Sequence, residues 1–145
     1  MKKLMCTAFA IVLLAGCGGA KKETKTCSQD LGSMNMSATF TAEDDTITKT
    51  SVKVSVDAAK AGVNMDKLSD EDKESMKTAM LNQMGVESGK GVETTVNFTD
   101  KAMEIVIDID MKDGDKATLK KLNLADETKL SDMVKSAEKN GATCK

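Results

Sequence analysis

The stretch Ala102-Met103-Glu104-Ile105-Val106-Ile107-Asp108-Ile109-Asp110 decides the fold. Large apolar side chains occupy every second position of it, whereas acidic side chains take most of the positions between them. Because successive side chains of a strand point to opposite faces, this alternation predicts a half-buried strand. A polar turn at residues 99–101 precedes it, and residues 92–98 alternate in the same way. We therefore expect an antiparallel hairpin with one buried and one polar face.

A second hairpin is expected upstream. Residues 34–40 place methionine, alanine and phenylalanine on one face and small polar side chains on the other. Residues 41–45 form a polar turn, and residues 48–56 then alternate between threonine or valine and lysine or serine. The two runs therefore predict a pair of strands that share a buried face.

Helices are expected between and after the hairpins. Ser69 and the acidic residues 70–72 mark a helix start, Gly85 marks its end, and Met76, Met80 and Met84 give it an apolar face. Leu119 and Leu122 indicate a short helical turn, and residues 131–140 a final helix that ends at Gly141. The predicted fold is α+β, of order ββαββα, with about four antiparallel strands and the helices on one face.

The segment before these elements has the pattern of a lipoprotein signal. Lys2 and Lys3 supply positive charge, residues 4–14 are almost entirely apolar, and Leu14-Ala15-Gly16 precedes Cys17. The apolar run is too short to span a bilayer, which takes about 20 residues. We expect residues 1–16 to be removed and Cys17 to carry acyl chains such as palmitate, which anchor the protein in the cell membrane. Ordinary secretion, with cleavage near Gly19 or Ala20, is the alternative.

This pattern divides the chain and places it outside the cytoplasm. Residues 17–26 would comprise the lipidated cysteine and a flexible tether, and residues 27–145 a single α+β domain. The expected location is extracytoplasmic, with the protein lipid-anchored to the bacterial cell membrane, or to the outer membrane where the host has one. The expected partners are the bilayer, through Cys17, and an envelope protein or a small apolar ligand.

Composition excludes several classes of function. All 21 basic residues are lysines, tryptophan and tyrosine are missing, and the formal net charge is −2. The chain therefore lacks the guanidinium groups and aromatic platforms of most nucleic-acid sites, so we expect no nucleic-acid partner. It also has no histidine, which removes the usual catalytic triads and most catalytic zinc sites. We expect no catalytic residue, no metal and no cofactor.

The four cysteines have separate expected fates. Cys6 would leave with the signal and Cys17 would take the lipid, so Cys27 and Cys144 remain as a pair in an oxidising compartment. A disulfide between them would close most of the chain into one loop, which stabilises a fold by about 4 to 5 kcal/mol. Two free thiols are the alternative.

Three short segments carry a family resemblance. Gly91-Val92-Glu93, Phe98-Thr99-Asp100 and Ile109-Asp110-Met111, downstream of the Cys17 motif and a hairpin, resemble the YehR-like lipoproteins. That family is a domain of unknown function. The resemblance implies a lipid-anchored α+β domain, and it implies no reaction, cofactor or catalytic residue.

Two groups of side chains are candidate sites. Glu104, Asp108 and Asp110 share one strand face and would either bind a hard cation or lie solvated opposite Lys49 or Lys53. The methionines are expected in the core, with a Met-lined pocket or Cu(I) ligands as alternatives. We therefore expect a non-enzymatic binding or interaction module of the envelope. A carboxylate-based envelope hydrolase is the alternative.

Overall fold

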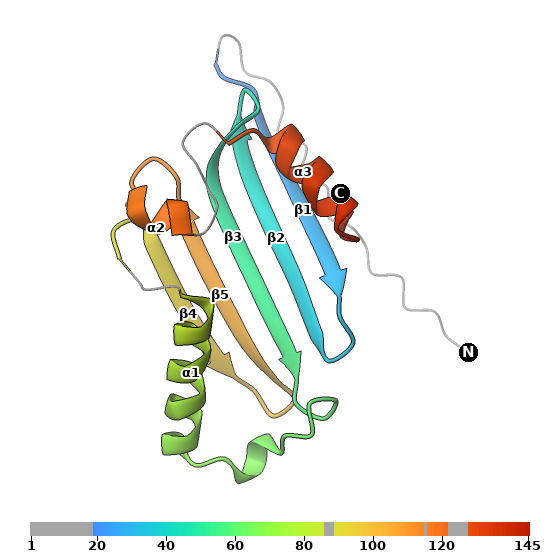
Figure 1. The fold of residues 1–145 in the computed structure, drawn as a ribbon, viewed down its shortest axis with the longest axis vertical. Helices are drawn as coiled ribbons and strands as arrows, with labels where there is room; N and C mark the ends of the chain where they lie inside the picture. The colour runs from blue at the N-terminus through green and yellow to red at the C-terminus, as the bar shows by residue number, and fades with distance from the viewer. Residues whose placement is uncertain (1–18, 86–88, 115, 122–127) are drawn as a thin grey trace, which may run out of the picture.

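A computed structural model of the chain describes residues 19–85, 89–114, 116–121 and 128–145 (Figure 1). These residues form a six-stranded antiparallel sheet in the order β4-β5-β3-β2-β1-β6. The strands are β1 (Lys22–Asp30), β2 (Met34–Glu43), β3 (Thr46–Asp57), β4 (Val92–Phe98), β5 (Ala102–Asp110) and β6 (Thr143–Cys144). The helices are η1 (Met65–Lys67), α1 (Asp70–Met84), α2 (Lys116–Lys121) and α3 (Leu130–Lys139).

The α+β class and the antiparallel sheet are confirmed, whereas the expected strand number and the order ββαββα are wrong in detail. The prediction lacks β1 and β6. Residues 22–26, which we expected to belong to a flexible tether, form the first part of β1. Apart from Cys27, no side chain of β1 is buried, so this strand has no apolar alternation to reveal it.

The two expected hairpins are confirmed. β2 pairs with β3 around a tight turn in which Asp44 and Asp45 both have positive φ, at 49° and 69°. Two such residues in succession match the right-handed twist of the flanking strands. β4 pairs with β5 around residues 99–101, and β5 also pairs with β3 in the centre of the sheet.

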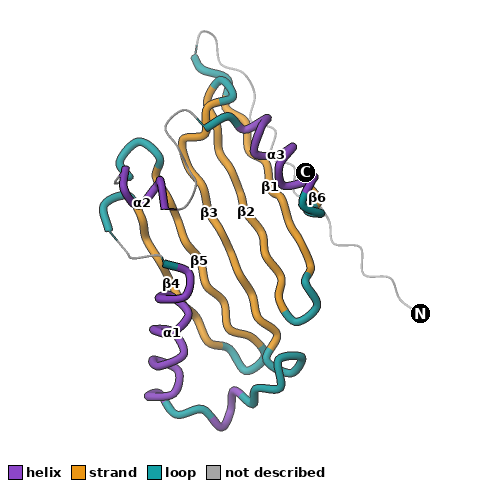
Figure 2. The backbone as a smooth tube through the Cα atoms, in the orientation of Figure 1, coloured by secondary structure: helices purple, strands orange, loops and turns teal. Residues whose placement is uncertain are grey.

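All three α-helices pack on the same face of the sheet (Figure 2). The central cluster contains inward side chains of β3, β4 and β5, with Ile105 completely buried, together with Leu119 of α2. Met80 of α1 and Met133 of α3 pack against this cluster. A second cluster joins Cys27, Phe40 and Ile47 to Leu130 of α3. The helices lie on one face of the sheet, as predicted, and the opposite face is polar.

Helix α1 begins and ends as its sequence indicates. The Ser69 hydroxyl accepts a hydrogen bond from the Asp72 backbone N–H at 3.1 Å, and the Asp72 carboxylate accepts one from the Ser69 N–H at 3.0 Å. These reciprocal bonds form a capping box. The Ser69 hydroxyl also donates to the Asp72 carboxylate at 2.6 Å, and this bond, followed by the bond from the Ser69 N–H, lowers the pKa of Asp72. Gly85 ends the helix in the left-handed conformation.

The disulfide between Cys27 and Cys144 is confirmed. The two residues lie directly opposite each other on β1 and β6, with their Cα atoms 4.0 Å apart and 117 positions apart in the chain. Backbone hydrogen bonds between Thr26 and Lys145 flank the bond on one side, at 2.9 and 3.0 Å. The disulfide therefore fixes the last residues of the chain to the edge of the sheet.

Candidate functional site

The open face of the sheet contains a shallow hollow over β2, β3, β4 and β5. Its volume is about 570 Å³. The side chains that line it from the open face are hydroxyls and charged groups: Thr39, Thr41, Lys49, Ser51, Glu93, Asp108 and Asp110. Gly89 and Gly91, at the start of β4, complete its rim. Thr50, Val92 and Ile109 also border the hollow, but their side chains are buried on the opposite face of the sheet. The side chains that the open face itself presents to the hollow are polar.

Strand register explains why these side chains meet. Glu93 lies opposite Asp108, Asp108 lies opposite Ser51, and Ser51 lies opposite Thr39. Each of these residues occupies an outward position of a strand whose neighbours in sequence point to the core, so the row lies on one face. The row continues to β1, where the Thr26 and Thr39 hydroxyls are 2.9 Å apart.

The three predicted acidic residues lie on this face, as expected, but they are spread along β5. Glu104 and Asp110 are six residues apart, which corresponds to about 20 Å along a strand. The Lys53 ammonium lies 2.8 Å from the Glu104 carboxylate, and the Lys49 ammonium 3.9 Å from that of Asp110. The expected opposition of Lys49 and Lys53 is therefore confirmed. The hydrolase alternative needs two converging acids and gains no support from this arrangement.

Asp108 differs from its two neighbours. Its side chain is exposed and faces Glu93 directly across the β4–β5 pair. Like charges directly opposite each other repel, so this pair gives the hollow a negative side. Sequence reasoning missed Glu93 as a lining residue. The turn at residues 99–101 fixes the hairpin register, so counting back from that turn would have found it.

Asp110 has a structural role at the end of β5. Its carboxylate accepts hydrogen bonds from the backbone N–H groups of Lys112, at 2.9 Å, and Asp113, at 3.3 Å. Aspartate side chains commonly close turns in this way. Within the described residues, no group of three or more Cys, Asp or Glu side chains is arranged to hold a metal ion.

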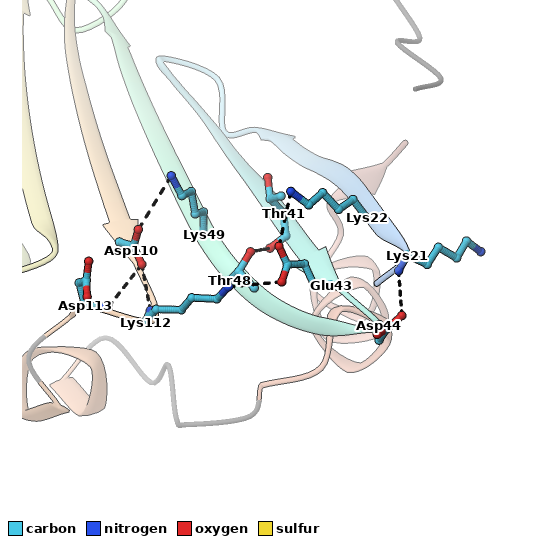
Figure 3. A network of polar contacts seen from close by, with 10 residues as sticks. All are labelled: Lys21, Lys22, Thr41, Glu43, Asp44, Thr48, Lys49, Asp110, Lys112 and Asp113. Atoms are coloured by element: carbon cyan, nitrogen blue, oxygen red, sulfur yellow. Dashed lines mark hydrogen bonds and ion pairs between the residues drawn. The ribbon is translucent and has the colours of Figure 1, made fainter. Parts of the chain in front are cut away.

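Acidic and basic side chains also meet at the end of the sheet where β1 and β3 begin (Figure 3). The Glu43 carboxylate lies 3.6 Å from the Lys22 ammonium and 3.3 Å from that of Lys112. The backbone N–H of Lys21 donates to the Asp44 carboxylate at 2.9 Å, and the Asp44 N–H donates to the Lys21 carbonyl at 2.9 Å. Lys21 is therefore held to the turn between β2 and β3.

Asp45 joins the same turn to α3. Its carboxylate accepts hydrogen bonds from the Ser131 N–H at 2.9 Å and the Ser131 hydroxyl at 2.8 Å. The backbone bond and then the hydroxyl bond lower the pKa of Asp45. Its carbonyl accepts the Leu130 N–H at 2.8 Å. The carboxylate thus satisfies an amide at the start of α3 that has no partner within the helix.

The expected methionine core is observed for several side chains. Met65 and Met103 are buried, and Met34 and Met80 pack against buried clusters. Met36 differs because 38% of its surface is exposed, on the helix-bearing face of β2. The expected signal segment 1–16 and Cys17 lie outside the described residues, as do Asp115 and Leu122. None of the helices in the described part of the chain is long and apolar enough to cross a membrane.

A family model matches most of this chain. Residues 23–140 match the model described as a protein of unknown function, DUF1307. The chain belongs to the DUF1307 family. The matched region runs from the start of β1 to the end of α3, so it contains every strand that lines the hollow. The family description names no activity for this DUF1307 chain. No curated protein matches it.

Two solved structures resemble this DUF1307 chain in fold. One is the NMR structure of the YehR protein of Escherichia coli, at 17% identity and a TM-score of 0.63, covering 88% of this chain and 93% of that one. The other is the NMR structure of a protein from Streptococcus pneumoniae TIGR4, at 17% identity and a TM-score of 0.53, covering 100% of this chain and 96% of that one. The expected resemblance to YehR-like proteins is confirmed at the level of family and fold.

Proposed function

We propose that this protein is an exported lipoprotein, anchored through acylated Cys17, whose domain is a non-enzymatic binding module of the cell envelope. The observation that carries the proposal is the disulfide between Cys27 and Cys144. Disulfides of this kind persist in oxidising compartments outside the cytoplasm. The same compartment is indicated by the positive, apolar and Leu14-Ala15-Gly16-Cys17 segments of the signal.

The open face supports a binding role. It is uncovered by the described helices, and it contains a hollow of about 570 Å³ with hydroxyl and charged side chains. A polar lining of this kind suits a polar partner such as an envelope protein better than a small apolar ligand. Two ion pairs of this face would complement charges on such a partner: Lys49 with Asp110 in the hollow, and Lys53 with Glu104 outside it.

Substitution of the two cysteines before the domain tests the anchor. In Cys17→Ala, we expect the protein to leave the membrane fraction and to lack the mass of acyl chains, because no other residue would accept them. The matched control is Cys6→Ala, which lies in the apolar run and should process normally. Membrane retention of Cys17→Ala equal to that of the parent would refute the anchor.

Site-directed photo-crosslinking in living cells tests the binding role. A crosslinking amino acid at Ser51 lies in the hollow, whereas one at Ser55 lies on the same face of β3 outside it. We expect one defined crosslinked species from position 51 and much less of it from position 55. Replacement of Asp108 by Asn should weaken that species. Equal labelling at both positions, or none at position 51, would contradict a partner at the hollow.

A further inference from the structure

The structure shortens the link between Cys17 and the folded domain. The backbone of Lys21 is hydrogen-bonded to Asp44 in both directions, and β1 begins at Lys22 (Figure 3). Only residues 18–20 therefore separate Cys17 from the first residue that is held to the domain. The chain advances by four residues from Cys17 to Lys21, so even when fully extended it places these two residues at most about 14 Å apart. The sequence alone allows a longer tether, through residue 26.

The attachment point lies at one end of an elongated sheet. We call this the anchor end; it comprises residues 21–22, 43–47, 112–113 and 128–131, where β1 and β3 begin and β2 ends. The distal end comprises the loops at residues 31–33, 58–65 and 99–101 (Figure 1). β3 runs the whole distance between the two ends in 12 residues, which corresponds to about 36 to 40 Å.

We propose that the anchor end rests on the lipid head groups and that the distal end projects away from the bilayer. This inference rests on the proposed acylation of Cys17. The link of residues 18–20 limits how far the anchor end can move from the lipid. The domain can still pivot about its attachment at Lys21, and this motion moves the distal end through the space above the bilayer. The length of the link and the place where it joins the domain thus determine which surface faces the membrane.

Charge at the anchor end does not oppose this arrangement. Lys21, Lys22, Lys112 and Lys129 lie there beside Glu43, Asp44, Asp45 and Asp113, so the formal charges balance. The lysine side chains of Lys22 and Lys112 are 75% and 65% exposed and reach the surrounding solvent or head groups. Because the charges of the described residues at this end balance, we expect the link, and not attraction to anionic lipid, to set the orientation. The orientation should therefore change little with salt or with the content of anionic lipid.

The proposed orientation also determines where the hollow lies relative to the bilayer. Thr41, Lys49 and Asp110 are only a few residues from the anchor end on β2, β3 and β5. The hollow therefore opens sideways, close to the membrane surface. A partner that reaches it would approach along the bilayer, as another membrane-bound protein does.

Paramagnetic broadening in lipid nanodiscs tests the orientation. The full lipidated chain would be placed in phosphatidylcholine discs with and without a gadolinium-chelating head group, and amide signals compared. We expect the enhancement at Asp44, Thr46 and Lys129 to exceed that at Gly32, Gly62 and Lys101 by at least about tenfold, because the ends are about 36 Å apart. Equal broadening, or stronger broadening at the distal end, would overturn the inference.

A lengthened link is the matched control. Insertion of 20 Gly and Ser residues between Gly19 and Ala20 adds a span of about 25 Å and should reduce the contrast between the two ends. An unchanged contrast would show that the link does not set the orientation. If the chain carries no acyl mass and does not enter the discs, the proposed anchor is refuted, and the proposed orientation is refuted with it. If the acylated chain enters the discs without the expected contrast, only the orientation fails.

Discussion

At the scale of single residues, Asp45 joins two parts of the chain that are far apart in sequence. Its left-handed backbone closes the β2–β3 turn, while its carboxylate binds Ser131 at the start of α3. In the sequence, this role is indicated only by two adjacent aspartates in a polar turn. The start of α3 could be predicted from local pattern, but its cap could not, because the cap is 86 residues away.

Replacement of Asp45 should make stability less dependent on pH. Hydrogen bonds from the Ser131 N–H and hydroxyl hold the folded pKa of Asp45 below its ordinary value. Its carboxylate therefore contributes stability that is complete above the unfolded pKa and is lost as pH falls through the folded pKa. In Asp45→Asn, urea midpoints should be lower near pH 6, and the difference from the parent should shrink below about pH 4. Asn also tolerates the left-handed backbone of this position, so the turn should persist.

The control for this substitution is Asp132→Asn, at an exposed position in the first turn of the same helix. It removes a charge near the same dipole without removing a bond to Ser131. We expect it to alter the pH profile less than Asp45→Asn does. Equal profiles for the two variants would show that helix charge, and not the bond to Ser131, is responsible.

Loss of the disulfide should cause a large loss of stability. In the double variant Cys27→Ala, Cys144→Ala, chain entropy predicts a decrease of about 4 to 5 kcal/mol in the free energy of unfolding for a loop of 117 positions. That decrease corresponds to a fall in Tm of at least about 10 °C. Reductant should produce a similar fall in the parent and none in the double variant. A parent whose Tm is insensitive to reductant would contradict this account.

At the scale of elements, β4 can begin beside the turn after β5 because neither contact residue has a side chain. A Cβ on Gly91 would lie 2.5 Å from both the Cα and the N of Gly114. Backbone atoms cannot yield as a flexible side chain can. The glycines therefore let β4 and the turn after β5 approach closely at the rim of the hollow.

Two glycine substitutions separate this contact from backbone strain. Gly91 and Gly62 both have φ of +73°, but a Cβ on Gly62 would meet nothing within 4 Å. Gly62→Ala should therefore cost only the left-handed strain of about 1 to 2 kcal/mol. Gly91→Ala should cost more than about 4 kcal/mol, because the contact must also be relieved. Urea denaturation of both variants measures the difference, and equal losses would contradict the contact.

The elements differ in how far the sequence predicts them. β2, β3, β4 and β5 were predicted because their apolar side chains alternate over a buried face, and α1 because Ser69 and Gly85 mark its ends. β1 and β6 were not predicted because their positions depend on pairing: β1 lies along β2, and β6 is two residues fixed by Cys144. The candidate site was predicted in part. The alternation of β5 identified Asp108 and Asp110, whereas Glu93 is identified by the register between β4 and β5.

At the scale of the whole molecule, the two sides of the sheet differ in how they are used. The helices pack on the apolar face and cover the core, whereas the open-face side chains that line the hollow lie outside that core. The packing of the helices is uneven. Leu130 of α3 and Leu119 of α2 are buried, whereas α1 has only half-buried or exposed side chains among those described. Local stability should therefore be lowest at α1.

Hydrogen exchange should reveal this gradient. We expect amides of α1 to exchange by local opening, much faster than those of β3 and β5, whose exchange should require global unfolding. Met80→Ala removes a contact between α1 and the central cluster and should speed exchange in α1 alone. Ile105→Ala removes a completely buried side chain and should cost about 2 to 5 kcal/mol, so it should speed exchange throughout the sheet. If Met80→Ala accelerated β5 as much as α1, the helix would unfold with the sheet as one unit, and the gradient would be absent.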